Sequence, residues 1–176
     1  MEIYDSLLGA VCDEYDRVTL IKKSERGEVT LIRHRASGNR YIFRHFSGSS
    51  EVYRKLLTVS CPNLPQIMEV GEKEGKTALL EEYVQGDTLG EILQGGLLTA
   101  AQAKQITRQL CMALWVLHSL GVVHRDVKPD NVIIRGTEAV LIDFDASRIY
   151  KMKQRRYTDS WNHRLCSTGT VWALPV

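Results

Sequence analysis

The most informative part of the sequence is the run His124-Arg125-Asp126-Val127-Lys128-Pro129-Asp130-Asn131. It comes after a segment with apolar residues at helical spacing and before a short apolar segment, 132–134, that is typical of a strand. A second acidic cluster, Asp143-Phe144-Asp145, follows the next strand-like segment, 139–142. The sequence therefore predicts two loops, close together in the chain, that each adjoin a short strand and carry acidic or amide side chains.

The side chains on these two loops are those that phosphoryl transfer requires. The reaction needs a carboxylate to orient a hydroxyl, oxygen ligands for Mg²⁺, and a cation to neutralise charge on the moving phosphate. The two loops offer these groups on Asp126, Lys128, Asn131 and Asp143. Phosphoryl transfer is therefore the chemistry that the pattern indicates.

The first loop resembles the catalytic loop of eukaryotic-type protein kinases, including the compact versions found in bacteria. The family pattern H-R-D-L-x-x-x-N is matched except that Val127 replaces the leucine. A chance match at six family positions (His124, Arg125, Asp126, Lys128, Pro129 and Asn131) has a probability on the order of 10⁻⁸ per start, at about one in twenty each. A lysine two residues after the aspartate, here Lys128, resembles the pattern of the serine/threonine class of this family. The resemblance implies that Asp126 is the catalytic base, that Lys128 contacts the γ-phosphate, and that Asn131 and Asp143 hold Mg²⁺.

The loop that covers the phosphates in this family is only partly matched. Its pattern G-x-G-x-x-G-x-V is met at Gly27 and Val29, while Lys22 and Ser24 stand at the first two glycines. Without those glycines the backbone approaches phosphates less closely, and a side chain of Lys22 or Ser24 is the alternative contact. By itself the segment is more typical of an ordinary hairpin.

The motif V-A-I-K of the third strand falls on residues 41–44. Arg44 therefore replaces the phosphate-anchoring lysine, and a planar fork is not equivalent to a point charge. Ile42 replaces the small residue that usually faces adenine, which is expected to narrow the pocket. The resemblance implies that Glu51, the only acid in the next predicted helix, pairs with Arg44; the alternative is a solvated glutamate.

Residues 80–84 resemble the strand that leads into the hinge between the kinase lobes. Glu82 and Val84 are expected to present backbone groups to adenine, and Ile133 to form the floor under it, although Ile133 fits a plain core position equally well. Glu81 stands where the family usually has an apolar side chain. Either it pairs with Arg44, or the alignment is one residue out of register.

Two departures affect the second half of the chain. Asp145 replaces the glycine of the motif D-F-G, while the metal ligand Asp143 is present. Residues 169–176 resemble the end of an activation segment but lack its final glutamate, and the chain then stops. We therefore expect a truncated or degenerate kinase whose incomplete second lobe self-associates or is covered by a partner.

The order of expected elements predicts an α+β protein with the two-lobe protein-kinase-like fold. Residues 1–15 are an N-terminal helical segment, 16–84 an antiparallel β-sheet lobe, and 85–176 a partial, mainly helical lobe. We expect strands at 17–23, 28–35, 40–46, 66–71, 76–83, 132–134 and 139–142, and helices at 2–13, 50–58, 88–94 and 100–119. The longest of these helices carries an apolar stripe expected to lie in the core: Ala103, Ile106, Leu110, Ala113, Leu114 and Leu117.

Composition narrows the protein class. The 176 residues carry 23 basic and 21 acidic side chains, a balance without a nucleic-acid-binding signature. Basic residues gather at 22–45 and 148–164, which fits either two solvated faces or affinity for phosphates or acidic peptides. The apolar runs are too short to span a membrane, the N-terminus lacks a secretory signal, and the four cysteines form no CxxC pair. A cytoplasmic protein with reduced thiols is expected.

Two functional interpretations remain. The first is a protein serine/threonine kinase that uses ATP and Mg²⁺ to phosphorylate protein substrates. The alternative is a pseudokinase that acts as a nucleotide-binding or protein-docking module. The loop around Asp126 favours the first, whereas Arg44 and the missing glycines favour the second. Lys128-Pro129 and residues 169–170 argue against a small-molecule phosphotransferase of related fold.

Overall fold

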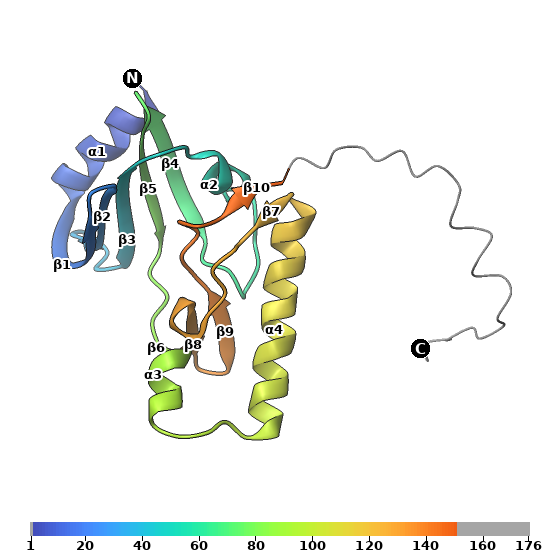
Figure 1. The fold of residues 1–176 in the computed structure, drawn as a ribbon. Helices are drawn as coiled ribbons and strands as arrows, with labels where there is room; N and C mark the ends of the chain where they lie inside the picture. Colours follow the sequence, from blue (N-terminus) through green and yellow to red (C-terminus); the bar gives the residue numbers. More distant parts are fainter. Residues whose placement is uncertain (1, 151–176) are drawn as a thin grey trace, which may run out of the picture.

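The computed structural model describes residues 2–150, so that most of the basic stretch 148–164 and the resemblance at 169–176 lie outside the described residues. The first lobe is a five-stranded antiparallel sheet in the order β1-β2-β3-β5-β4, with one helix packed on it and one beside it (Figure 1). Its elements are α1 (Ile3–Glu14), β1 (Tyr15–Ser24), β2 (Gly27–His34), β3 (Arg40–Ser47), α2 (Glu51–Leu56), β4 (Ile67–Lys73) and β5 (Lys76–Glu82). All seven were expected from the sequence, with bounds that differ by a few residues.

The second lobe consists of one long helix, one short helix, a 3₁₀ turn and five short strands within the described residues. A three-stranded sheet has the order β6-β8-β9, and β7 pairs with β10. The elements are β6 (Asp87–Thr88), α3 (Leu89–Gln94), α4 (Ala100–Ser119), β7 (Val122–Val123), the 3₁₀ turn η1 (Pro129–Asn131), β8 (Val132–Arg135), β9 (Glu138–Leu141) and β10 (Arg148–Ile149). The sequence did not predict the two-residue strands, because they depend on partners far along the chain rather than on a local pattern.

Both helices of this lobe begin with a capping box. The Thr88 and Thr99 side chains each accept a hydrogen bond from the backbone N–H three residues later, and the Glu91 and Gln102 side chains bond back to the cap residues. These bonds satisfy backbone donors that the first turn leaves without partners. The starts of both helices are thus encoded locally.

The two faces of the large sheet belong to different cores. On one face, α1 packs Tyr4, Leu7 and Val11 against Ile32, Phe43, Ala78 and Leu80. The other face belongs to a cluster that runs through both lobes and includes Tyr53, Leu56, Leu79, Ala113, Leu117, Leu141 and Phe144. This continuous core fixes the sheet lobe relative to α4 and to the loop that begins at Asp143.

Helix α4 is less buried than its apolar stripe predicts. Of the stripe, Ala113 and Leu117 are buried, Ile106, Leu110 and Leu114 are partly buried against the core, and Ala103 is exposed; Trp115, off the stripe, has 67% of its surface exposed. The 20-residue helix is about 30 Å long, whereas its partner strands β9 and β7 have only four and two residues, so part of the helix has no strand beside it. Within residues 2–150, no helix is long and apolar enough to cross a membrane.

Candidate active site

Asp126, Lys128 and Asn131 lie together at the loop between β7 and β8. The Lys128 Nζ is 3.0 Å from the Asp126 Oδ2. The Asn131 side-chain amide donates to the same carboxylate oxygen at 2.9 Å and to the Asp126 backbone carbonyl at 2.8 Å. The hydrogen bond from Lys128 lowers the pKa of Asp126, and the bond from Asn131 adds to the effect. The Asp126 carboxylate is therefore ionised at neutral pH and held in one orientation.

His124 links this loop to the loop after β9. Its Nε2 donates to the carbonyl oxygen of Ile142 at 3.1 Å, and its Nδ1 accepts from the backbone N–H of Asp126 at 3.3 Å. This assignment of the ring proton to Nε2 follows from the two partners. Burial lowers the pKa of His124, so the ring is neutral at pH 7. Arg125 (φ 69°) and Asp143 (φ 65°), one on each loop, have left-handed backbone that costs about 1–3 kcal/mol each.

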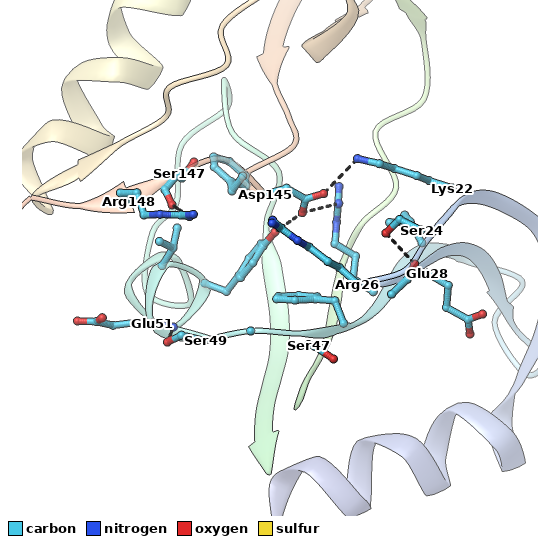
Figure 2. A pocket seen from close by; sticks show the side chains of 18 of the residues that line it. Lys22, Ser24, Arg26, Glu28, Ser47, Ser49, Glu51, Asp145, Ser147 and Arg148 are labelled. Atoms are coloured by element: carbon cyan, nitrogen blue, oxygen red, sulfur yellow. Dashed lines mark hydrogen bonds and ion pairs between the residues drawn. The ribbon is translucent and has the colours of Figure 1, made fainter. Parts of the chain in front are cut away.

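Asp143 and Asp145 face two cations from the sheet lobe, Lys22 and Arg44, and Figure 2 shows Lys22 beside Asp145. The Lys22 Nζ is 3.2 Å from Asp145 Oδ2 and 3.7 Å from Asp143 Oδ2, and the Arg44 Nη1 is 3.4 Å and 3.7 Å from the Oδ1 atoms of the same residues. The buried Tyr53 hydroxyl donates to Asp145 at 3.3 Å. Burial would raise the pKa of Asp145, but the charges of Arg44 and Lys22 outweigh it and lower that pKa. Two cations and two carboxylates therefore meet between the lobes.

The partner of Arg44 is Glu81, not Glu51. The Arg44 Nε donates to the Glu81 Oε1 at 2.8 Å, and both side chains are buried. Burial raises the pKa of Glu81. Burial would lower the pKa of Arg44, but the adjacent Glu81 charge raises it overall, so the guanidinium stays charged.

The expected pairing of Glu51 with Arg44 is wrong for this structure. Glu51 is exposed, and Figure 2 shows its carboxylate turned away from Asp145. Glu51 is the first residue of α2, where its side chain is exposed. The Nε of Arg44 is bonded to Glu81 instead.

A cavity of about 560 Å³ lies between the β1–β2 hairpin, β3, α2 and residues 144–149. Its basic lining residues are Lys22, Arg26, Arg44 and Arg148, and its acidic ones are Glu28, Glu51 and Asp145. Among the expected nucleotide contacts, Gly27, Val29, Arg44 and Glu51 line it. The lining has more basic than acidic side chains, which suits an anionic ligand.

The four residues expected around adenine lie outside that lining: Ile42, Glu82, Val84 and Ile133. Ile42 pairs with Glu81 across the sheet, and Ile133 is half-buried in β8. Val84 is buried, and the Glu82 carboxylate accepts from Arg135 at 2.6 Å. The structure places them along β3, the end of β5 and β8, but it does not join them to the cavity.

Gly27 has a structural role in the hairpin. A Cβ at this position would lie 2.2 Å from the carbonyl oxygen of His45, closer than real Cβ atoms approach. Gly27 also pairs with Ser24 across the turn. The glycine is therefore required by the close approach of β3, whether or not its N–H contacts a phosphate.

The chemistry of Asn131 and Asp143 fits Mg²⁺. Magnesium prefers oxygen donors such as carboxylates and amide carbonyls. Because the Asn131 amide nitrogen donates to Asp126, its oxygen is the atom left to contact a cation. Among residues 2–150 there is no preformed cluster of three or more His, Cys, Asp or Glu side chains that could hold a metal by itself. A metal here is expected to draw further ligands from phosphate and water.

Sequence reasoning missed the roles of Tyr53 and Asp145 and left that of Glu81 open. Glu81 did give a signal, since it is a charge directly after the apolar run Ala78-Leu79-Leu80. Asp145 was visible only as a departure from the family pattern. Nothing local marks Tyr53, whose bond to Asp145 joins residues far apart in the chain.

Comparison with known proteins finds serine/threonine protein kinases among the relatives of this chain. Serine/threonine-protein kinase pkn2 of Myxococcus xanthus is 35% identical over 100 residues, which cover 54% of this chain and 12% of that protein. CBL-interacting protein kinase 15 of Oryza sativa subsp. japonica is 30% identical over 177 residues, which cover 93% of this chain and 40% of that protein. The chain thus spans less than half the length of these relatives.

The fold is also that of a solved kinase structure. The crystal structure of Rad53 1-466 in complex with AMP-PNP aligns with a TM-score of 0.66 at 22% identity, covering 76% of this chain and 39% of that chain. At this identity the likeness concerns the fold alone. The model of the protein kinase domain matches residues 17–170, from β1 through both loops of the site. This chain therefore belongs to the protein kinase family.

Proposed function

We propose that this chain transfers the γ-phosphate of ATP, with Mg²⁺, to serine or threonine hydroxyls of protein substrates. The observation that carries the proposal is the Asp126 carboxylate, which Lys128 and Asn131 hold ionised and oriented, although none of the three lines the cavity between the lobes. In this role Asp126 accepts the proton of the substrate hydroxyl as the hydroxyl attacks phosphorus. Serine/threonine kinases among the relatives support the choice of hydroxyl.

The other residues take supporting roles in the proposal. Lys128 is close enough to Asp126 to neutralise a phosphate that approaches the carboxylate. Asn131 and Asp143 would hold Mg²⁺, which supplies neutralisation of charge between the phosphates. Lys22 and Arg44 supply further positive charge where the phosphates are expected, at the cavity that both residues line.

A second candidate function is a pseudokinase that binds a nucleotide or a protein partner without phosphoryl transfer. The observation in its favour is that Lys22 and Arg44 already contact Asp143 and Asp145. These ion pairs compete with phosphate for the cations and with Mg²⁺ for Asp143. The two candidates differ in one respect. In a kinase, bound Mg²⁺-ATP replaces these ion pairs and phosphoryl transfer follows; in a pseudokinase, no transfer follows.

A radiolabelled transfer assay separates the candidates. The wild-type chain is incubated with Mg²⁺ and γ-labelled ATP, beside Asp126→Asn and the matched variant Asp130→Asn, which changes an exposed aspartate of the same loop. We expect Asp126→Asn to lose about 10²–10⁴-fold in transfer rate, the usual contribution of a general base. Asp130→Asn should stay close to wild type. Equal transfer by Asp126→Asn and wild type would contradict the proposal, and nucleotide binding without transfer would favour the pseudokinase.

A further inference from the structure

We infer that Glu81 positions the Arg44 guanidinium for the nucleotide, so that the sheet itself, rather than helix α2, supplies the carboxylate that holds this cation. The inference rests on the proposed function, because it concerns the same nucleotide site. It assigns a role to a side chain that the family pattern leaves unexplained. In this inference, α2 contributes no carboxylate to the position of the Arg44 guanidinium.

The strand register places the two side chains together. In the antiparallel pair β3–β5, Arg44 lies opposite Leu79 and Ile42 lies opposite Glu81. Residues two apart on a strand share a face, so Arg44 and Glu81 are diagonal neighbours on one face of the sheet. Leu79 belongs to the core shared by both lobes, which identifies this face as the one turned toward the site. Backbone pairing therefore fixes the ion pair.

The geometry of arginine divides its donors between two groups. The Nε contacts Glu81 at 2.8 Å, while the Nη1 lies 3.4 Å from Asp145 and 3.7 Å from Asp143. A lysine ammonium on the same strand is a single point charge and lacks the fork that spans these positions. Neither contact uses the Nη2 of Arg44. Glu81 thus holds the inner edge of the guanidinium while the outer edge faces the cavity.

Packing alone does not explain why a carboxylate, that of Glu81, is buried in the sheet. The carboxylate follows Ala78, Leu79 and Leu80 in the sheet and is buried, and its Oε2 has no hydrogen-bond partner among the described residues. A buried ion pair is often no more stabilising than apolar side chains of similar size. A role of Glu81 in orienting Arg44 accounts for a buried ion pair at this position.

Helix α2 has no carboxylate that could take this role in the described structure. Its one acid is the exposed Glu51, and the α2 side chain closest to the cluster is Tyr53, a neutral hydroxyl donor to Asp145. The orientation of Arg44 therefore does not depend on a charge carried by α2. Displacement of α2 is expected to leave the Arg44–Glu81 contact in place.

The test follows the Arg44 Nε–H signal by ¹⁵N NMR in the nucleotide-free chain. We expect a resolved signal in wild type, since this N–H is buried and bonded. Glu81→Gln retains an acceptor and should keep the signal, whereas Glu81→Leu should lose it. Glu51→Gln should leave it unchanged. Persistence of the signal in Glu81→Leu, or its loss in Glu51→Gln, would overturn the inference.

The second readout is the dissociation constant for Mg²⁺-ATP. We expect Glu81→Leu to raise it about tenfold or more, the effect of misplacing one charge-assisted hydrogen bond, and Glu81→Gln to raise it by no more than about threefold. Glu69→Leu is the matched control, because Glu69 lies on the neighbouring strand β4 opposite Leu80, on the face covered by α1. Unchanged affinity in Glu81→Leu would overturn the positioning role.

Two further outcomes keep the test decisive. If Glu81→Leu does not fold, the double variant Arg44→Met/Glu81→Leu replaces the pair by apolar side chains, and Glu81→Gln still separates acceptor from charge. Loss of affinity in Glu81→Gln equal to that in the double variant would then overturn positioning through the hydrogen bond. If wild type binds no nucleotide, the proposed function fails, while the NMR comparison still decides whether Glu81 holds Arg44.

Discussion

His124 is held in one protonation state by what its two ring nitrogens contact. The Nε2 needs its proton to donate to Ile142, and the Nδ1 needs its lone pair to accept from Asp126. A second proton would break the bond to Asp126 and place a charge on a ring that is only 1% exposed to solvent. The neutral ring therefore stabilises the arrangement of both loops.

A pH dependence of stability follows from His124. Its pKa is lowered in the folded state, mainly by burial, so the unfolded chain takes up the proton first as the pH falls. The contribution is complete above the unfolded pKa of about 6.5 and is lost progressively below it. We expect the free energy of unfolding in urea to fall below that pH, and less steeply in His124→Gln. The exposed His118→Gln serves as control; parallel profiles for His124→Gln and wild type would contradict this account.

Single residues also show where sequence reasoning reaches its limit. The site contains one local group of residues, Asp126, Lys128 and Asn131, which lie within six positions of one another in the chain. Their side chains are in contact in the structure, as expected for a local motif. The pair Arg44–Glu81 spans 37 positions and depends on the register of two strands. Because a shift of register by one residue moves a side chain to the other face, the sequence left two alternatives open for Glu81.

Among the elements, the β1–β2 hairpin and α2 determine the shape of the cavity. Lys22 extends from the hairpin to Asp143 and Asp145, and Tyr53 reaches Asp145 from α2. The hairpin was expected from its strand pattern and Gly27, and it forms with the close packing against β3 that requires a glycine. Helix α2 was also expected, over 50–58 where the structure has Glu51–Leu56, but the pairing of Glu51 with Arg44 was wrong because Glu81 takes that place.

Helix α4 offers a test of local encoding. Its N-cap Thr99 accepts from the backbone N–H of Gln102 at 3.2 Å. We expect Thr99→Ala to lower the free energy of unfolding by about 1 kcal/mol, and Thr99→Ser, which retains the hydroxyl, to lower it by much less. Urea denaturation measures both. An equal loss in the two variants would show that the hydroxyl is not what stabilises the helix start.

At the scale of the whole molecule, the site is assembled across the two lobes. Lys22, Arg44 and Tyr53 come from the sheet lobe, and Asp143 and Asp145 from the loop after β9. The two-lobe fold could be predicted because the strand and helix patterns and the motif around Asp126 agree. The residues that close the site could not, since their contacts arise only when the shared core brings the lobes together.

The central claim of this account is that the chain binds ATP together with Mg²⁺ and that Asp143 holds the metal ion. Isothermal titration of wild type with ATP, with and without Mg²⁺, tests it directly beside Asp143→Asn and the control Asp87→Asn, which changes an exposed aspartate on β6. We predict saturable binding by wild type and Asp87→Asn that weakens when Mg²⁺ is removed, and loss of this Mg²⁺ dependence in Asp143→Asn. Binding by Asp143→Asn with the affinity and Mg²⁺ dependence of wild type would contradict the claim.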